Sequence, residues 1–89
     1  MFRVWSRIMK DNKLIVDTTI EIDDSDTRTH KVFRALEKTC HELDLSNPIW
    51  LETNIKEFKK IARTRFYQDS FIDKIDFDYL DFYVIEEDC

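Results

Sequence analysis

The chain has 89 residues, a length that predicts a single domain over residues 1–89 with a modest hydrophobic core. Hydrophobic residues make up 43% of the chain and aromatic residues 13%, a composition that argues against disorder. The absence of glycine excludes collagen-like sequences and glycine-dependent phosphate loops. The net charge of −5 argues against duplex DNA as a partner, because that binding depends on neutralising phosphates.

The first ten residues show neither the apolar region nor the small-residue cleavage site of a signal peptide. No run approaches the roughly 18 apolar residues of a membrane span. The two cysteines, Cys40 and Cys89, are therefore interpreted as free thiols in a reducing compartment. We expect a cytoplasmic protein that does not bind a membrane.

The N-terminal quarter of the chain predicts a β-hairpin. Residues 2–9 alternate between one face with Phe2, Val4, Ser6 and Ile8 and another with Arg3, Trp5, Arg7 and Met9. Residues 14–22 alternate between one face with Leu14, Val16, Thr18, Ile20 and Ile22 and another with Ile15, Asp17, Thr19 and Glu21. Such alternation, rich in β-branched residues, is typical of strands. Asp11 and Asn12 between them tolerate the positive φ angles of a type I′ turn.

The next segment predicts a helix from about Thr27 to Leu43 or Asp44. Ser25 or Asp26 is the expected N-cap. The apolar positions recur every three or four residues and form one stripe, made of Val32, Phe33, Leu36, Cys40 and Leu43. Pro48 lies beyond the end of this helix and disfavours helical angles at the residue before it.

Residues 49–51 form a short apolar segment that we expect to anchor on the core. Asn54 and Glu57 resemble a capping box, so a second helix is predicted from about Ile55 to Ile61. The residues that we expect this helix to bury are Ile55, Phe58 and Ile61 or Ala62.

The C-terminal segment predicts two more strands. Residues 63–68 are rich in strand-forming side chains, residues 69–70 predict a turn, and residues 71–77 fit no single pattern. Residues 78–86 alternate and predict the central strand of the sheet. The inward positions of that strand are Leu80, Phe82 and Val84, and the other face carries Tyr79, Asp81, Tyr83 and Ile85.

This order of elements predicts an α+β fold, a two-layer sandwich with the helices on one face of the sheet. It has an N-terminal β-hairpin, two helices, and C-terminal strands that join the hairpin in one mainly antiparallel sheet.

The metal-binding residue types lack the spacing of known metal sites. The acidic cluster of Glu21, Asp23, Asp24 and Asp26 has neither the glycine nor the spacing of an EF-hand loop, so we interpret it as the start of a helix. The remaining candidate ligands, His30, Cys40, His41 and Cys89, show none of the close pairs of zinc sites. We expect no metal and no cofactor.

Cys40 and His41 are the enzyme alternative, as a thiol nucleophile with a neighbouring base. That chemistry needs an exposed thiol of low pKa with histidine in hydrogen-bond reach. Cys40 lies on the apolar stripe of the predicted helix, where a small buried residue is expected. We find no catalytic constellation and expect a protein that is not an enzyme.

The second face of the predicted sheet is the preferred functional surface. Its candidate interface residues are Trp5, Met9, Ile15, Tyr83 and Ile85. Aromatic residues and methionine mixed with arginine are enriched at the centres of protein interfaces. We expect a protein-interaction or regulatory module that binds a protein partner or a second copy of itself. The competing interpretation is that the C-terminal residues or residues 49–51 cover this face.

The alternative function is binding of single-stranded nucleic acid by a basic segment. Its candidate residues are Lys56, Lys59, Lys60, Arg63 and Arg65, followed by Phe66 and Tyr67 as stacking surfaces. The competing interpretation is that these cations face water or the protein's own carboxylates.

Several segments of the chain carry a resemblance. They are residues 26–36 (DTRTHKVFRAL), 45–51 (LSNPIWL), 64–72 (TRFYQDSFI) and 75–80 with 84–88 (IDFDYL, VIEED), together with the opening hairpin. These segments resemble a family of short, uncharacterised proteins of Firmicutes, over nearly the whole chain. The resemblance implies a bacterial cytoplasmic protein and assigns no activity and no catalytic residues.

Overall fold

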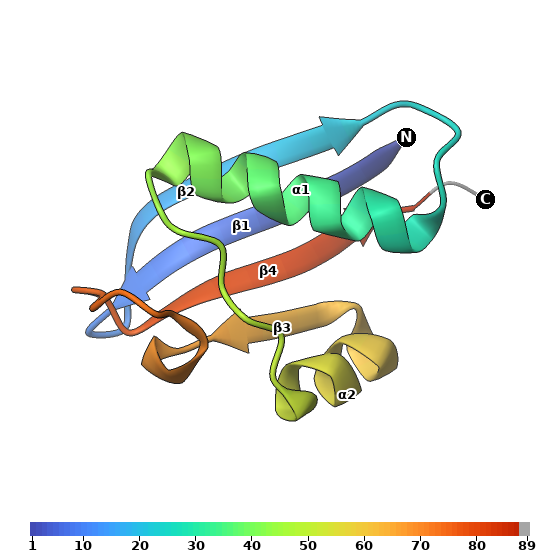
Figure 1. Ribbon diagram of the computed structural model, residues 1–89. Helices are drawn as coiled ribbons and strands as arrows, with labels where there is room; N and C mark the ends of the chain where they lie inside the picture. Colours follow the sequence, from blue (N-terminus) through green and yellow to red (C-terminus); the bar gives the residue numbers. More distant parts are fainter. Residues whose placement is uncertain (88–89) are drawn as a thin grey trace.

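A computed structural model of the protein describes residues 1–87. Its elements are β1 (Phe2–Lys10), β2 (Lys13–Ile22), α1 (Arg28–Leu43), α2 (Glu52–Ile61), β3 (Arg63–Phe66), a 3₁₀ turn η1 (Gln68–Ser70) and β4 (Tyr79–Glu86). The strands form one sheet in the order β2-β1-β4-β3, and all neighbours are antiparallel. Both helices lie on one face of this sheet (Figure 1). The predicted α+β two-layer sandwich is therefore confirmed, and β4 is a central strand as predicted.

The hairpin of β1 and β2 follows the predicted turn chemistry. Asp11 and Asn12 have φ angles of 53° and 64°, as a type I′ turn requires. Buried and part-buried residues alternate from Phe2 to Met9, which confirms the two predicted faces of β1.

Two irregularities interrupt the alternation of the strands beside β1. Directly paired residues of antiparallel strands share a face. Leu14 pairs with Met9 and Val16 pairs with Ile8, so Leu14 and Val16 lie on opposite faces with Ile15 as an extra residue between them. The prediction that one face of β2 carries both Leu14 and Val16 is therefore wrong.

The second irregularity lies between β1 and β4. Arg3 pairs with Glu86 and Val4 pairs with Val84, which leaves Ile85 as the extra residue. Such bulges depend on how two distant strands pair, so alternation within one strand does not predict them.

Helix α1 begins at Arg28, and its N-cap lies one residue after Asp26, the later of the two predicted caps. The N-cap is Thr27, whose hydroxyl accepts a hydrogen bond from the backbone N–H of His30 at 3.3 Å. Val32, Leu36 and Cys40 are buried as predicted. Phe33 is 51% exposed, so its assignment to the core is wrong.

Helix α2 begins at Glu52, three residues before the predicted start. Asn54 is not its cap, because its side chain lies inside the first turn and accepts a hydrogen bond from the backbone N–H of Leu51 at 3.0 Å. The Asn54 amide also donates to Thr64 Oγ1 and to the Arg65 carbonyl, both at 2.9 Å. Asn54 therefore ties the start of α2 to β3.

The capping box predicted at Asn54 and Glu57 is wrong, since Glu57 accepts a hydrogen bond from the backbone of Arg65. Phe58 is buried as predicted, and Ala62, the predicted alternative to Ile61, is partly buried against the core, but Ile55 and Ile61 are exposed. Helix α2 therefore contributes a narrower apolar surface than expected.

The hydrophobic core fills the space between the sheet and the two helices. Its buried residues are Phe2, Val4, Ile8, Ile20, Ile22, Val32, Ala35, Leu36, Cys40, Phe58, Phe66, Phe71, Leu80, Phe82 and Val84. The indole ring of Trp50 packs edge-on against the rings of Phe58 and Phe66, with centroids 5.3 and 5.0 Å apart. The predicted anchor at residues 49–51 is thus confirmed, and it lies on the helix side of the sheet.

The chain between β3 and β4 contains one regular element. Strand β3 ends at Phe66, so the predicted extension to residue 68 is too long. Residues 69–70 belong to η1, where a turn was predicted, and residues 71–78 form neither helix nor strand.

Candidate interaction face

One face of the sheet carries no helix (Figure 1). The strand register assigns its residues, starting from the side of β1 that points away from the core. We call it the outer face, and it consists of Arg3, Trp5, Arg7 and Met9 of β1, Leu14, Asp17, Thr19 and Glu21 of β2, Tyr79, Asp81, Tyr83 and Glu86 of β4, and Arg63 and Arg65 of β3.

The charges of the outer face form alternating columns across the sheet. In the order β2-β1-β4-β3, the charged residues of successive strands are acidic, basic, acidic and basic. Arg3 contacts Glu21 at 2.7 Å on one side and Glu86 at 3.0 Å on the other. Each arginine column therefore lies next to at least one carboxylate column, and the charges of the face largely neutralise one another.

Asp81 is the centre of this arrangement. It is 0% exposed although no helix covers it. Arg63 donates to both of its carboxylate oxygens, at 3.0 and 2.6 Å, and Arg7 donates to one of them. Burial acts to raise the pKa of Asp81, but the hydrogen bonds from Arg63 and Arg7 outweigh it and lower that pKa below its ordinary value. Asp81 is therefore an ionised anchor for two arginines.

Aromatic rings hold three arginines of this face. The guanidinium of Arg7 lies 4.3 Å from the ring centre of Trp5, and the Trp5 indole N–H donates to Asp17 at 2.9 Å. Arg63 lies 5.1 Å from the ring of Tyr83. Cation–π contacts of this kind contribute about 0.5–1 kcal/mol at exposed sites. Together with the ion pairs to Asp81, they order the side chains of Arg7 and Arg63.

Arg65 differs from the other arginines of the outer face. Its guanidinium lies 4.6 Å from the ring of Tyr79, which in turn lies 5.4 Å from the ring of Tyr67. A hydrogen bond with Tyr67 raises the pKa of Arg65. Within residues 1–87, no carboxylate forms an ion pair with its guanidinium. Arg65 and its two tyrosines thus form a corner of the face with an unneutralised cation.

The predicted interface residues do not all share one surface. Trp5, Met9 and Tyr83 lie on the outer face. Ile85 is the extra residue of a bulge, and Ile15 lines a surface cavity on the helix side together with Ile8 and Leu43. The structure therefore brings three of the five residues together.

Sequence reasoning missed the central role of Asp81 and the place of two arginines. Arg63 and Arg65 belong to the outer face, because they pair with Tyr83 and Asp81 across β3 and β4. The alternation of these arginines with buried Thr64 and Phe66 was the available signal. It remained ambiguous without the strand order.

The predicted basic segment is divided among several surfaces. Lys56 pairs with Glu52 at 3.2 Å, and Lys59 lines a groove between α1 and α2 beside Phe33. Lys60 is exposed on α2, whereas Arg63 and Arg65 lie on the outer face. The structure does not gather these five side chains into one patch.

The remaining candidates have local structural roles. Burial raises the pKa of the Cys40 thiol to about 11, so the thiol is protonated at neutral pH. Asp24 contacts Arg34 at 2.6 Å and Asp26 contacts His30 at 2.9 Å, beside the start of α1. Within the described part of the chain, no three side chains gather as metal ligands.

Comparisons with known proteins give no relative. No protein-family model, curated protein or solved structure matches the chain. None of the helices within residues 1–87 has the length and apolar character needed to cross a membrane.

Proposed function

We propose that this protein is a non-enzymatic interaction module that binds another protein through the outer face. The observation that supports this proposal is the stacking of Arg7, Arg63 and Arg65 on aromatic rings of a sheet face that no helix covers. Tryptophan, tyrosine and arginine dominate the binding energy of protein interfaces.

The ordered state of these side chains favours binding. Fixing a mobile side chain at an interface costs about 0.5–1.5 kcal/mol. Asp81 and the aromatic rings already hold Arg7 and Arg63 in place before any partner arrives. A partner therefore meets a surface that loses little conformational entropy on binding.

The chemistry of the partner follows from Arg65. A carboxylate beside an apolar side chain would pair with this unneutralised guanidinium and pack against the rings of Tyr79 and Tyr67. The other arginines of the face, Arg3, Arg7 and Arg63, already contact carboxylates, so a strongly acidic partner gains little from them. We therefore propose a protein segment with one acidic residue flanked by apolar residues.

The test is selection of binding peptides from a random library displayed on phage, followed by affinity measurement. We expect the selected peptides to share an acidic residue next to an apolar one. Arg65→Ala should weaken their binding about tenfold or more, the effect of a hot-spot arginine. The matched control is Lys60→Ala, which removes an exposed cation from α2.

Two outcomes would contradict this proposal. One is peptide binding that Arg65→Ala and Lys60→Ala weaken equally. The other is salt-sensitive binding of an oligothymidine with no peptide selected at all, which would favour the nucleic-acid alternative.

A further inference from the structure

The two edges of the sheet differ in length and protection. The β3 edge has 4 residues and is followed, after Tyr67, by the turn η1, whereas the β2 edge has 10 residues. Within residues 1–87, β2 pairs only with β1. One row of its backbone N–H and C=O groups therefore faces outward, ready to pair with another strand.

The β2 edge also carries an exposed apolar run. Leu14, Ile15 and Val16 are consecutive and are 49%, 58% and 41% exposed. No proline interrupts the strand. Two of its charged residues are engaged on the outer face, since Asp17 accepts from Trp5 and Glu21 pairs with Arg3. Proline, free charges and bulges are devices by which edge strands avoid pairing, and of these β2 has only the bulge at Ile15 near its start.

We propose that a second copy of this chain pairs with β2 through its own β2, antiparallel, so that two sheets join into one. The ends of the strand support this choice of partner and direction. Strand β2 begins at Lys13, which pairs with Lys10 at the end of β1, and the chain at its other end carries Glu21 and Asp23. Antiparallel pairing of two copies places each basic end beside the acidic end of its neighbour, whereas parallel pairing would join like charges.

The register of this pairing follows from the charges within the strand. A two-fold axis at Thr18 places Val16 opposite Ile20 of the second copy and Asp17 opposite Thr19. An axis at Asp17 would oppose two carboxylates, and an axis at Thr19 would oppose Asp17 and Glu21. Like charges directly opposite each other destabilise a strand pair, so the axis at Thr18 is favoured over those at Asp17 and Thr19.

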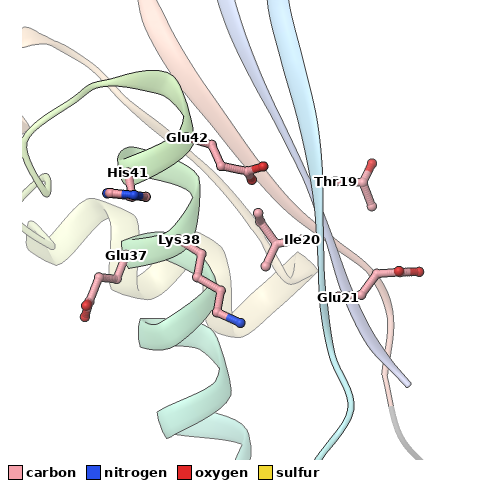
Figure 2. Close-up of a pocket in the computed structure, with 7 residues that line it drawn as sticks. All are labelled: Thr19, Ile20, Glu21, Glu37, Lys38, His41 and Glu42. Atoms are coloured by element: carbon pink, nitrogen blue, oxygen red, sulfur yellow. The ribbon is translucent and has the colours of Figure 1, made fainter.

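The surroundings of the edge leave room for a second copy. A hollow of about 570 Å³ lies beside β2 and is lined by Thr19, Ile20, Glu21, Glu37, Lys38, His41 and Glu42. Figure 2 shows that Ile20 points toward α1, while Thr19 and Glu21 lie on the other side of the strand. The side of α1 at this hollow carries both signs of charge, with Lys38 one turn from Glu42. Because this side of α1 carries both cations and anions, the same side of a second copy can approach it without a net repulsion of like charges.

Sedimentation velocity over roughly 1 µM to 1 mM protein is the first test. We expect the mass to rise toward twice the 10.9 kDa of the chain. Val16→Lys should raise the dissociation constant tenfold or more, because it puts an unpaired charge opposite Ile20 of the second copy. The matched control Ile72→Lys, at a residue that is 86% exposed between η1 and β4, should leave it unchanged. A monomer at all concentrations, or equal effects of the two variants, would overturn the proposal.

Disulfide trapping is a separate test of the axis. In a Cys89→Ser background, Thr18→Cys places two thiols opposite each other at the axis, and oxidised glutathione should link them into a dimer. The control is Thr53→Cys, at an exposed residue of α2, and it should form at least tenfold less disulfide-linked dimer. Equal linking of both variants would overturn the pairing. Neither test uses Arg65, so the dimer and the proposed peptide binding can fail independently.

Discussion

Asp81 and Phe82 are neighbours on β4, and both are 0% exposed. Phe82 points to the helix side, where its ring lies 6.0 Å from that of Phe58 and 6.3 Å from that of Trp50. Asp81 points to the open side, where arginines from β1 and β3 surround its carboxylate. One residue is buried by a second layer of structure, and the other is buried by side chains of its own sheet.

The difference shows how a small domain shields the open face of a sheet when helices cover only the other face. Long arginine side chains, held by aromatic rings and by one carboxylate, lie over the open face where helices are missing. The helix side depends on apolar packing, which responds little to pH. The open side depends on charge, so pH and salt should affect it selectively.

The largest effect that we predict tests the contribution of apolar packing on the helix side. Phe82→Ala should lower the free energy of unfolding by about 3–5 kcal/mol, the usual result of removing a buried phenylalanine ring. Urea denaturation measures this loss, which should be similar at pH 5 and pH 7. Phe33→Ala, at a ring that is 51% exposed, is the control and should lose much less. Equal losses would show that the helix side is not tightly packed around Phe82.

A smaller loss is expected on the charged side. Asp81→Asn should lower the free energy of unfolding by about 2–4 kcal/mol, since it leaves Arg7 and Arg63 without their shared carboxylate. We place it below the loss for Phe82 because both arginines are partly exposed and water reaches them. Urea denaturation at pH 7 measures the loss.

The pH dependence of this loss identifies its cause. The folded-state pKa of Asp81 is lowered from the ordinary 3.8, so its stabilisation is complete above that pH and is lost as the pH falls through the folded-state pKa. The difference between wild type and Asp81→Asn should therefore be constant from pH 7 to pH 5 and shrink below about pH 4. A difference that persists unchanged at pH 2 would assign the loss to packing instead of charge.

Much of this fold follows from local patterns in the sequence. The faces of β1, the inward residues of β4 and the turn at Asp11 and Asn12 were predicted, because side-chain alternation and turn angles depend on neighbouring residues. The start of α2 was not predicted. Asn54 forms hydrogen bonds with β3 as well as within the helix. A capping pattern considers only neighbouring residues, so it cannot predict such a contact between elements.

The candidate face was only partly predictable for the same reason. Trp5 and Tyr83 were placed on one face by alternation, and the structure pairs them. Ile15 and Ile85 were misplaced, because bulges arise from the register between strands. The role of Asp81 requires β4 to lie between β1 and β3, and strand order is a property of the whole chain.

The smallest predicted effect concerns a polar pair on the apolar helix side, which is an exception to the simple division into an apolar and a charged side. Ser6 and Thr39 are both buried on the helix side, and their hydroxyls form a hydrogen bond of 3.0 Å within the core. Ser6→Ala should lower the free energy of unfolding by about 1 kcal/mol, because the Thr39 hydroxyl loses its partner. In a helix that hydroxyl can turn to the carbonyl one turn back, which keeps the loss small.

A double-mutant cycle with Thr39→Val measures the hydrogen bond itself. Once either hydroxyl is gone, removing the other should cost less, so the loss for the double variant should be smaller than the sum of the single losses by about 0.5–1.5 kcal/mol. Urea denaturation of the four proteins gives this coupling. Strictly additive losses would mean that the two hydroxyls do not stabilise each other. The helix side around Ser6 would then depend on apolar packing, and its contrast with the charged side around Asp81 would be sharper.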